Sequence, residues 1–130
     1  MASAIVKQGH GDMIMVTDAG FAIPSDADVI DLSLDVNKPT VLEVLAMLKK
    51  YFSVEKMVMA NQTKDVSPTL FAYISKVFGE GVLVETVELS ELKDMSKTVK
   101  TVIRTGDFIA YGNVILVSGA GNRWFVEKEN

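Results

Sequence analysis

The sequence predicts an α/β sandwich in which helices flank a largely parallel central sheet. Two observations lead to this fold class. Short apolar runs alternate with segments of helical periodicity, and clusters of glycine, proline, aspartate and serine separate them. Because a strand–helix–strand succession places two strands parallel to each other, most pairs in the sheet should be parallel. The chain contains no internal repeat, low-complexity stretch or linker, so residues 1–130 are expected to form a single domain.

The first half of the chain contains three expected strands and one clear helix. The strands are apolar runs over 13–17, 29–34 and 54–60, and turn residues such as Pro24 precede the second of them. The helix is expected over 40–52, because Thr40 and Glu43 have the spacing of a capping box. Its core-facing stripe is expected to consist of Leu42, Leu45, Ala46 and Leu48.

The second half continues the alternation. Ser67 followed by Pro68 is typical of a helix start and Gly79 of a helix end, so a helix is expected over 67–78. Four further elements follow it: a strand at 82–87, a short helix at 90–95, and strands at 101–104 and 114–117 with the loop 105–113 between them. The tail 123–130 contains Trp124-Phe125-Val126, which fits either a last strand or a docking segment.

The composition excludes several classes of function. Hydrophobic residues make up 48% of the chain and charged residues 23%, as in a globular domain. The net charge of -4 argues against a nucleic-acid partner, because such binding needs a basic face. The absence of cysteine from the sequence excludes disulfides, thiolate catalysis and cysteine zinc sites, which fits a cytoplasmic location.

The hydropathy pattern indicates self-association rather than a membrane partner. No apolar run approaches the ~20 residues that span a bilayer, and the apolar part of the N-terminus is too short for a secretory signal. The mean hydropathy of +0.25 is high for a soluble monomer of this size. We therefore expect the protein to bury part of its surface against copies of itself.

The only histidine, His10, is the first candidate for acid–base chemistry. It lies in Gly9-His10-Gly11-Asp12, directly before the strand 13–17, and Asp18 follows that strand. Imidazole is the one side chain whose unperturbed pKa, roughly 6.5, allows proton exchange near neutral pH. Flanking glycines let a ligand approach the backbone, and strand ends at a crevice are common ligand sites in open α/β sheets. The alternative is a polar turn in which Asp18 caps the next turn.

The loop 105–113 is the second candidate. Tyr111 offers an apolar ring face to a sugar and a hydroxyl for a hydrogen bond. Asn113 offers a donor and an acceptor together, which suits vicinal hydroxyls. The alternative is an ordinary loop between two strands.

Two other motifs point to no site. Gly119-Ala120-Gly121 follows a strand, but Trp124 occupies the sixth position of a dinucleotide-binding fingerprint and no long helix follows. A metal site is not expected either, because the chain has a single histidine and its clustered carboxylates are spread over a turn and a strand. These carboxylates belong to Asp26, Asp28, Asp31 and Asp35.

Taken in order, the segments of the chain resemble the family of D-ribose pyranases and L-fucose mutarotases, which are sugar-ring isomerases. Five pieces, spread over nearly the whole chain, carry the resemblance. They are Gly9-His10-Gly11-Asp12, Asp18-Ala19-Gly20-Phe21-Ala22-Ile23-Pro24, Ile30-Asp31-Leu32-Ser33-Leu34, Val102-Ile103-Arg104-Thr105-Gly106-Asp107 and Tyr111-Gly112-Asn113-Val114-Ile115-Leu116.

The resemblance implies a fold, an assembly and a site. The fold is the ribose pyranase-like α/β sandwich, and the assembly is a ring-like homo-oligomer, typically a decamer. His10 corresponds to the proton donor, Asp18 binds sugar, and the segment from Tyr111 through Gly112 to Asn113 also binds sugar. No cofactor and no metal is implied. Tyr111 and Asn113 complete either their own subunit's site or that of a neighbour.

The resemblance leaves the subtype and the activity open between alternatives. More segments look ribose-type than fucose-type, so D-ribose is the first expected substrate and an L-fucose-type mutarotase is the alternative. Leu89 falls where the family has a histidine or an arginine that binds sugar, and a leucine cannot hydrogen-bond a hydroxyl. A sugar-binding or sugar-transport accessory protein without catalysis is therefore the alternative of another class, and an oligomer that binds no sugar is the third. The chain also has only residues 2–8 before the Gly-His motif, where the family has a longer helix, and its tail 122–130 runs past the usual end.

Overall fold

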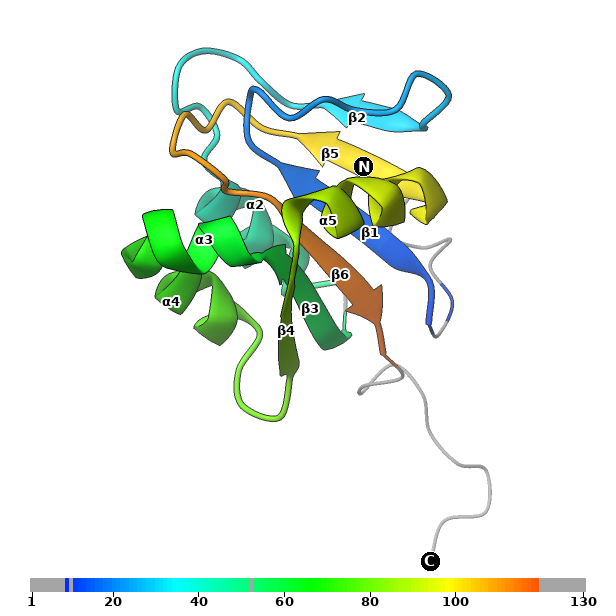
Figure 1. Ribbon diagram of the computed structural model, residues 1–130, viewed down its shortest axis with the longest axis vertical. Coiled ribbons are helices and arrows are strands. Elements are labelled where there is room, and N and C mark those ends of the chain that lie inside the picture. The colour runs from blue at the N-terminus through cyan, green and yellow to red at the C-terminus, as the bar shows by residue number, and fades with distance from the viewer. Residues whose placement is uncertain (1–8, 10, 52, 120–130) are drawn as a thin grey trace, which may run out of the picture.

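A computed structural model describes residues 9, 11–51 and 53–119, and these residues are arranged around one six-stranded sheet (Figure 1). The strands lie in the order β2-β5-β1-β6-β3-β4. Their bounds are Met13–Thr17 for β1, Val29–Asp31 for β2, Val54–Ala60 for β3, Leu83–Val87 for β4, Thr101–Arg104 for β5 and Val114–Ser118 for β6.

The sheet is largely parallel, as the sequence predicts. Strand β5 pairs in parallel with both β1 and β2, and β3 pairs in parallel with β4. Strand β6 joins the two parallel groups, because it pairs antiparallel with β1 on one side and with β3 on the other. The carboxyl ends of β1 to β5 therefore meet at one edge of the sheet, where β6 begins. We call this the carboxyl edge and the opposite one the amino edge.

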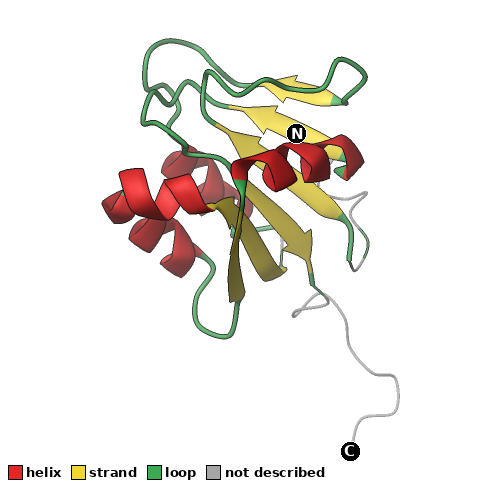
Figure 2. Cartoon of the chain, viewed as in Figure 1, coloured by secondary structure: helices red, strands yellow, loops and turns green. Residues whose placement is uncertain are grey.

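Helices cover both faces of this sheet (Figure 2). In the described chain they are α2 (Val41–Leu48), α3 (Asn61–Val66), α4 (Pro68–Val77) and α5 (Leu89–Met95), and the 3-10 helix η1 (Ser96–Thr98) follows the last of them. Helix α5 crosses the front face in Figure 1, and α2 lies behind the sheet. The fold class expected from the sequence is confirmed.

The two-residue period of the strands divides the apolar residues between two cores. In β1, Ile14 and Val16 pack on the face covered by α2 and α4, whereas Met15 packs on the face covered by α5. Strand β3 does the same with Met57 and Val58, and all five side chains are fully buried. This alternation is what a sheet with helices on both faces requires.

Several predicted boundaries were wrong. Strand 29–34 ends at Asp31, because the Asp31 carboxylate accepts a hydrogen bond from Ser33 N at 2.9 Å and turns the chain there. Helix 40–52 has the predicted Thr40–Glu43 capping box but ends at Leu48, beyond which the chain closes with i→i−3 hydrogen bonds. Phe52 lies outside the described residues.

The predicted apolar stripe of this helix also needs correction. The buried residues of α2 are Val41, Val44, Leu45 and Leu48. These positions follow the spacing i, i+3, i+4, i+7. Val41 and Val44 therefore face the core in place of the predicted Leu42 and Ala46. Ala46 is consequently exposed, and Leu42 is only half-buried.

The remaining elements fall close to their expected ranges, with one addition. Helix α4 begins at Pro68 and ends before Gly79, and residues 105–113 contain no helix or strand, as expected. Helix α3 was not predicted, because its sequence Asn-Gln-Thr-Lys-Asp-Val has no apolar periodicity and no side-chain cap. The tail 123–130 lies outside the described residues.

Candidate functional site

Asp18 lies at the carboxyl edge, directly after β1, in a turn that its own side chain closes. Its Oδ1 accepts a hydrogen bond from Gly20 N at 3.1 Å, and its backbone N donates to Oδ1 of Asn113 at 2.8 Å. Burial raises the pKa of the Asp18 carboxyl above its usual value, although backbone N–H groups of Gly20, Gly112 and Phe21 act in the opposite direction. Asp18 is thus a half-buried carboxylate at the end of a rigid strand.

Asn113 brings the loop 105–113 to this carboxylate. It is 4% exposed and is the last residue before β6, so the sheet fixes its position. Because its carbonyl oxygen accepts from Asp18 N, its amide NH2 is the group left to donate to a ligand. Residues 95 positions apart in the sequence therefore form one unit.

The rest of the loop is held against α3 and α4. Thr63 donates from Oγ1 to the carbonyl of Tyr111 at 2.6 Å, and Ser67 donates from Oγ to the carbonyl of Ala110 at 2.8 Å. Tyr111 has a φ of 60°, which a residue with a side chain rarely adopts outside strained or functional segments. Gly112 is packed so closely that an added Cβ would lie 3.1 Å from Leu70. It contributes backbone rather than a side chain, and its N–H faces Asp18.

A cavity of about 360 Å³ lies at the carboxyl edge. Asp18, Tyr111 and Asn113 lie in its wall, as expected from the sequence, and so does Leu89 at the start of α5. Lys93, one turn along α5, and Phe21 also line the cavity, and neither was predicted from the sequence as a site residue. A small polar molecule fits a cavity of this kind, in which an apolar wall carries a few convergent polar groups.

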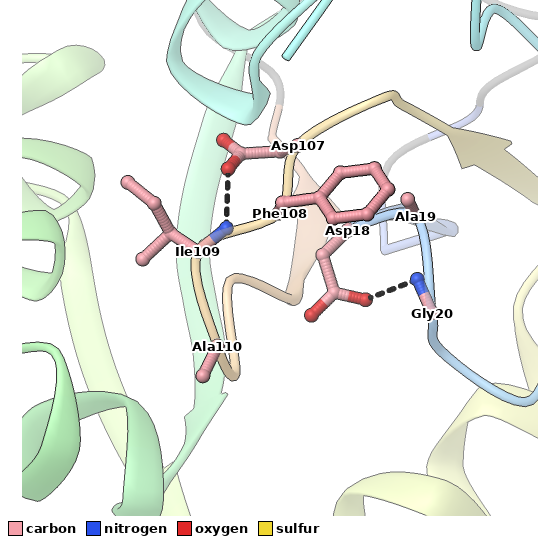
Figure 3. A pocket seen from close by; sticks show the side chains of 7 residues that line it. All are labelled: Asp18, Ala19, Gly20, Asp107, Phe108, Ile109 and Ala110. Carbon is pink, nitrogen blue, oxygen red and sulfur yellow. Dashed lines mark hydrogen bonds between the residues drawn. The ribbon is translucent and has the colours of Figure 1, made fainter. Parts of the chain in front are cut away.

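A second hollow of about 240 Å³ adjoins the first and shares Asp18, Gly20 and Ala110 with it. Figure 3 shows its lining, in which the Asp18 carboxylate is turned toward Gly20 N and the Asp107 carboxylate toward Ile109 N. Phe108, 66% exposed, and Ile109, 47% exposed, form its outer wall. The open side of the site is thus apolar.

Gly9 and Gly11, the residues on either side of His10, lie at the amino edge instead. His10 itself is outside the described residues, but the residues on both sides of it are described. Gly11 donates from N to the carbonyl of Ser118, at the end of β6, and Gly9 donates from N to the Asp12 carboxylate. Lys100 lies 2.9 Å from the same carboxylate, and its hydrogen bond holds the pKa of Asp12 below its usual value.

The described residues contain neither a cluster suited to a metal ion nor a helix suited to a membrane. No group of three or more histidine, cysteine, aspartate or glutamate residues among them is arranged to hold a metal ion. None of their helices has the length and the apolar composition needed to cross a membrane.

Comparison with known proteins decides the family. A model of the RbsD / FucU transport protein family matches residues 1–121. The chain belongs to this family. Among curated family members, a D-ribose pyranase of Clostridium botulinum is 38% identical over 119 residues, which cover 92% of this chain and 90% of that protein. A D-ribose pyranase of Thermotoga maritima is 39% identical over 123 residues, with the same coverage of both chains.

Solved structures of the RbsD / FucU family agree with the fold. The structure of Bacillus subtilis RbsD complexed with D-ribose has a TM-score of 0.88 and 33% identity, and covers 92% of this chain and 90% of that chain. The fucose mutarotase of Streptococcus pneumoniae, crystallised with L-fucose, has a TM-score of 0.76 at 18% identity, with 92% and 90% coverage. The second likeness concerns the fold alone.

Proposed function

We propose that this protein is a sugar-ring isomerase that interconverts the pyranose and furanose forms of free D-ribose. The observation that carries the proposal is the cavity at the carboxyl edge, where the Asp18 carboxylate, the Asn113 amide and Tyr111 meet in one wall. Such groups bind vicinal hydroxyls. Support comes from curated relatives called D-ribose pyranase at 38% and 39% identity and from the ribose-bound structure at 33% identity.

The chemistry needs few groups. Conversion of a pyranose to a furanose passes through the open-chain sugar, so the ring oxygen must gain a proton while the anomeric hydroxyl loses one. In this proposal His10 is the general acid that protonates the ring oxygen, and water accepts the proton of the anomeric hydroxyl. Asp18 orients the sugar, while Tyr111, Asn113 and the backbone of Gly112 hold its hydroxyls. No cofactor or metal enters this step.

The positions of the residues that flank His10 support a site formed by two copies of the chain. Gly9 and Gly11, which flank His10, lie at the amino edge, whereas Asp18 lies at the carboxyl edge beyond the whole of β1. At a rise of about 3.3 Å per residue, the path from Gly11 to Asp18 is on the order of 20 Å, too far for one sugar to touch both. We propose that the His10 turn of one copy approaches the cavity of the next.

Exposed apolar residues at the carboxyl edge support such an assembly. Phe108 and Ile109 are joined to the neighbouring loop 35–38 by a hydrogen bond from Phe108 N to Oδ1 of Asn37 at 3.0 Å. In that loop Val36 is 57% exposed, and nearby Leu34 is 84% exposed. A second copy would cover these side chains. We propose a ring-like homo-oligomer, a decamer, with a cytoplasmic location. Light scattering that finds a monomer at micromolar concentration would contradict the assembly.

The function is tested by the exchange rate between ribose ring forms, measured by saturation-transfer NMR with the wild type and with His10→Ala. We expect the wild type to accelerate exchange and the variant to lose the acceleration. L-Fucose run in parallel distinguishes the mutarotase alternative, because a larger acceleration with fucose would reassign the substrate. Ribose that binds without faster exchange would instead favour a sugar-binding accessory protein, with Leu89 as the residue to replace by histidine.

A further inference from the structure

The Asp107 carboxylate is buried between the site and helix α2. The residue is 1% exposed. Its Oδ2 accepts a hydrogen bond from Val41 N, in the first turn of α2, at 2.9 Å, and its Oδ1 accepts from Ile109 N at 2.9 Å. The positive end of α2 and two N–H groups thus compensate a charge that burial would otherwise disfavour.

The backbone of Asp107 holds the Asp18 turn, which forms part of the wall of the smaller hollow. Its carbonyl accepts from Ala19 N at 2.8 Å, next to Asp18, while Arg104 Nη1 holds the carbonyl of Ala19 at 2.8 Å. Asp107 N in turn donates to Oγ1 of Thr105 at 3.2 Å. A single residue therefore connects the Asp18 turn, the loop that carries Tyr111 and the start of α2.

Asp107 also acts on Asp18 through its charge. Both carboxylates line the smaller hollow, and the negative charge of Asp107 adds to the rise that burial causes in the pKa of Asp18. Two cationic groups also lie near Asp18. Lys93 on α5 lines the larger cavity, and Arg104 on β5 donates to the carbonyl of Ala19. Helix α5 carries Glu91 and Asp94 as well. Neither cationic group contacts the Asp107 carboxylate through a described hydrogen bond.

We infer that Asp107 is a positioning residue of the sugar site, which sets the loop 108–113 against the Asp18 turn. This inference rests on the proposed function only for the identity of the sugar. The arrangement explains why an aspartate is needed here. Asparagine could accept from only one of the two N–H groups and would turn its own NH2 toward the other.

The test compares Asp107→Asn with Thr40→Ala. The Thr40 side chain caps the same helix, with its Oγ1 accepting from Glu43 N at 3.1 Å, but does not line either hollow. Both variants should lose thermal stability. Only Asp107→Asn should lower the pKa of Asp18, read by carbon NMR without sugar, and weaken ribose binding about fivefold, as expected for one lost hydrogen bond.

If Asp107→Asn behaves like Thr40→Ala in both the Asp18 titration and the ribose affinity, the inference is overturned. Should Asp107→Asn not fold, Asp107→Glu replaces it. The glutamate keeps the charge but displaces the carboxylate, so ribose binding should weaken while Asp18 titrates as in the wild type; unchanged binding would overturn the inference. A wild type that binds no ribose would refute the proposed function, yet the Asp18 titration would still decide the role of Asp107.

Discussion

Replacement of Asn113 by alanine should lower both the kcat/KM for ribose and the free energy of unfolding. The substitution removes two hydrogen bonds at once. Asp18 N loses the acceptor that now lies 2.8 Å away, and the sugar loses the amide donor. At about 1 kcal/mol for each bond, the transition state loses roughly 2 kcal/mol, which corresponds to about a 30-fold fall in kcat/KM. The free energy of unfolding should fall by about 1–2 kcal/mol, because the Asp18 N–H remains half-buried without a partner.

Ribose exchange by saturation-transfer NMR and thermal unfolding measure the two effects. Asn61→Ala is the matched control, because Asn61 donates from Nδ2 to Glu88 at 3.1 Å in an exposed hydrogen bond and does not line the cavity. The control should keep wild-type exchange and lose no more than about 0.5 kcal/mol of stability. Exchange in Asn113→Ala within twofold of the wild type would refute the reasoning, since it would mean that the amide neither holds the Asp18 turn nor contacts the sugar.

Four further substitutions test the packing and the charge around the site. Thr17→Val should raise the midpoint of thermal unfolding, because Thr17 Oγ1 is buried with no partner among the described residues; Thr105→Val should lower it, because Thr105 Oγ1 donates to the carbonyl of Thr17 at 2.7 Å. Gly106→Ala should cost roughly 3 kcal/mol in urea unfolding, because its Cβ would lie 2.7 Å from the carbonyl oxygen of Lys38. Asp18→Asn should unfold at a higher temperature than the wild type at pH 7. Burial raises the folded-state pKa of Asp18, so wild-type stability falls as the pH rises through that pKa, and the gap between the two proteins should narrow toward about pH 3. A gap that does not change with pH would contradict this assignment.

The fold could be predicted wherever the local signal agreed with the tertiary structure. The Thr40–Glu43 capping box and the Pro68 helix start are such signals, since their hydrogen-bond and backbone requirements are local. Helix α3 could not be found, because its polar sequence is held by tertiary contacts, among them the bond from Thr63 to the Tyr111 carbonyl. The antiparallel entry of β6 between β1 and β3 is likewise a matter of chain topology, which strand patterns do not contain.

The candidate site was only partly accessible to sequence reasoning. Asp18, Tyr111 and Asn113 were named as separate motifs and lie in one wall of a cavity. The bond between Asp18 and Asn113 could not be inferred, because it depends on β1 and β6 being neighbours. Lys93 was missed because a lysine on a short helix looks like any solvated residue. The assignment of His10 stays a prediction, as its position lies outside the described residues.

The most direct test of the account is complementation between two defective chains. His10→Ala and Asp18→Asn are expressed separately and together, and ribose exchange is measured by saturation-transfer NMR. Each variant alone should be nearly inactive. If each site joins His10 of one copy to the Asp18 cavity of another, random mixing of the two variants restores about one site in four. In such a site the Asp18→Asn chain supplies His10 and the His10→Ala chain supplies Asp18. Mixed oligomers whose activity stays at the sum of the two separate variants would contradict a site made by two copies.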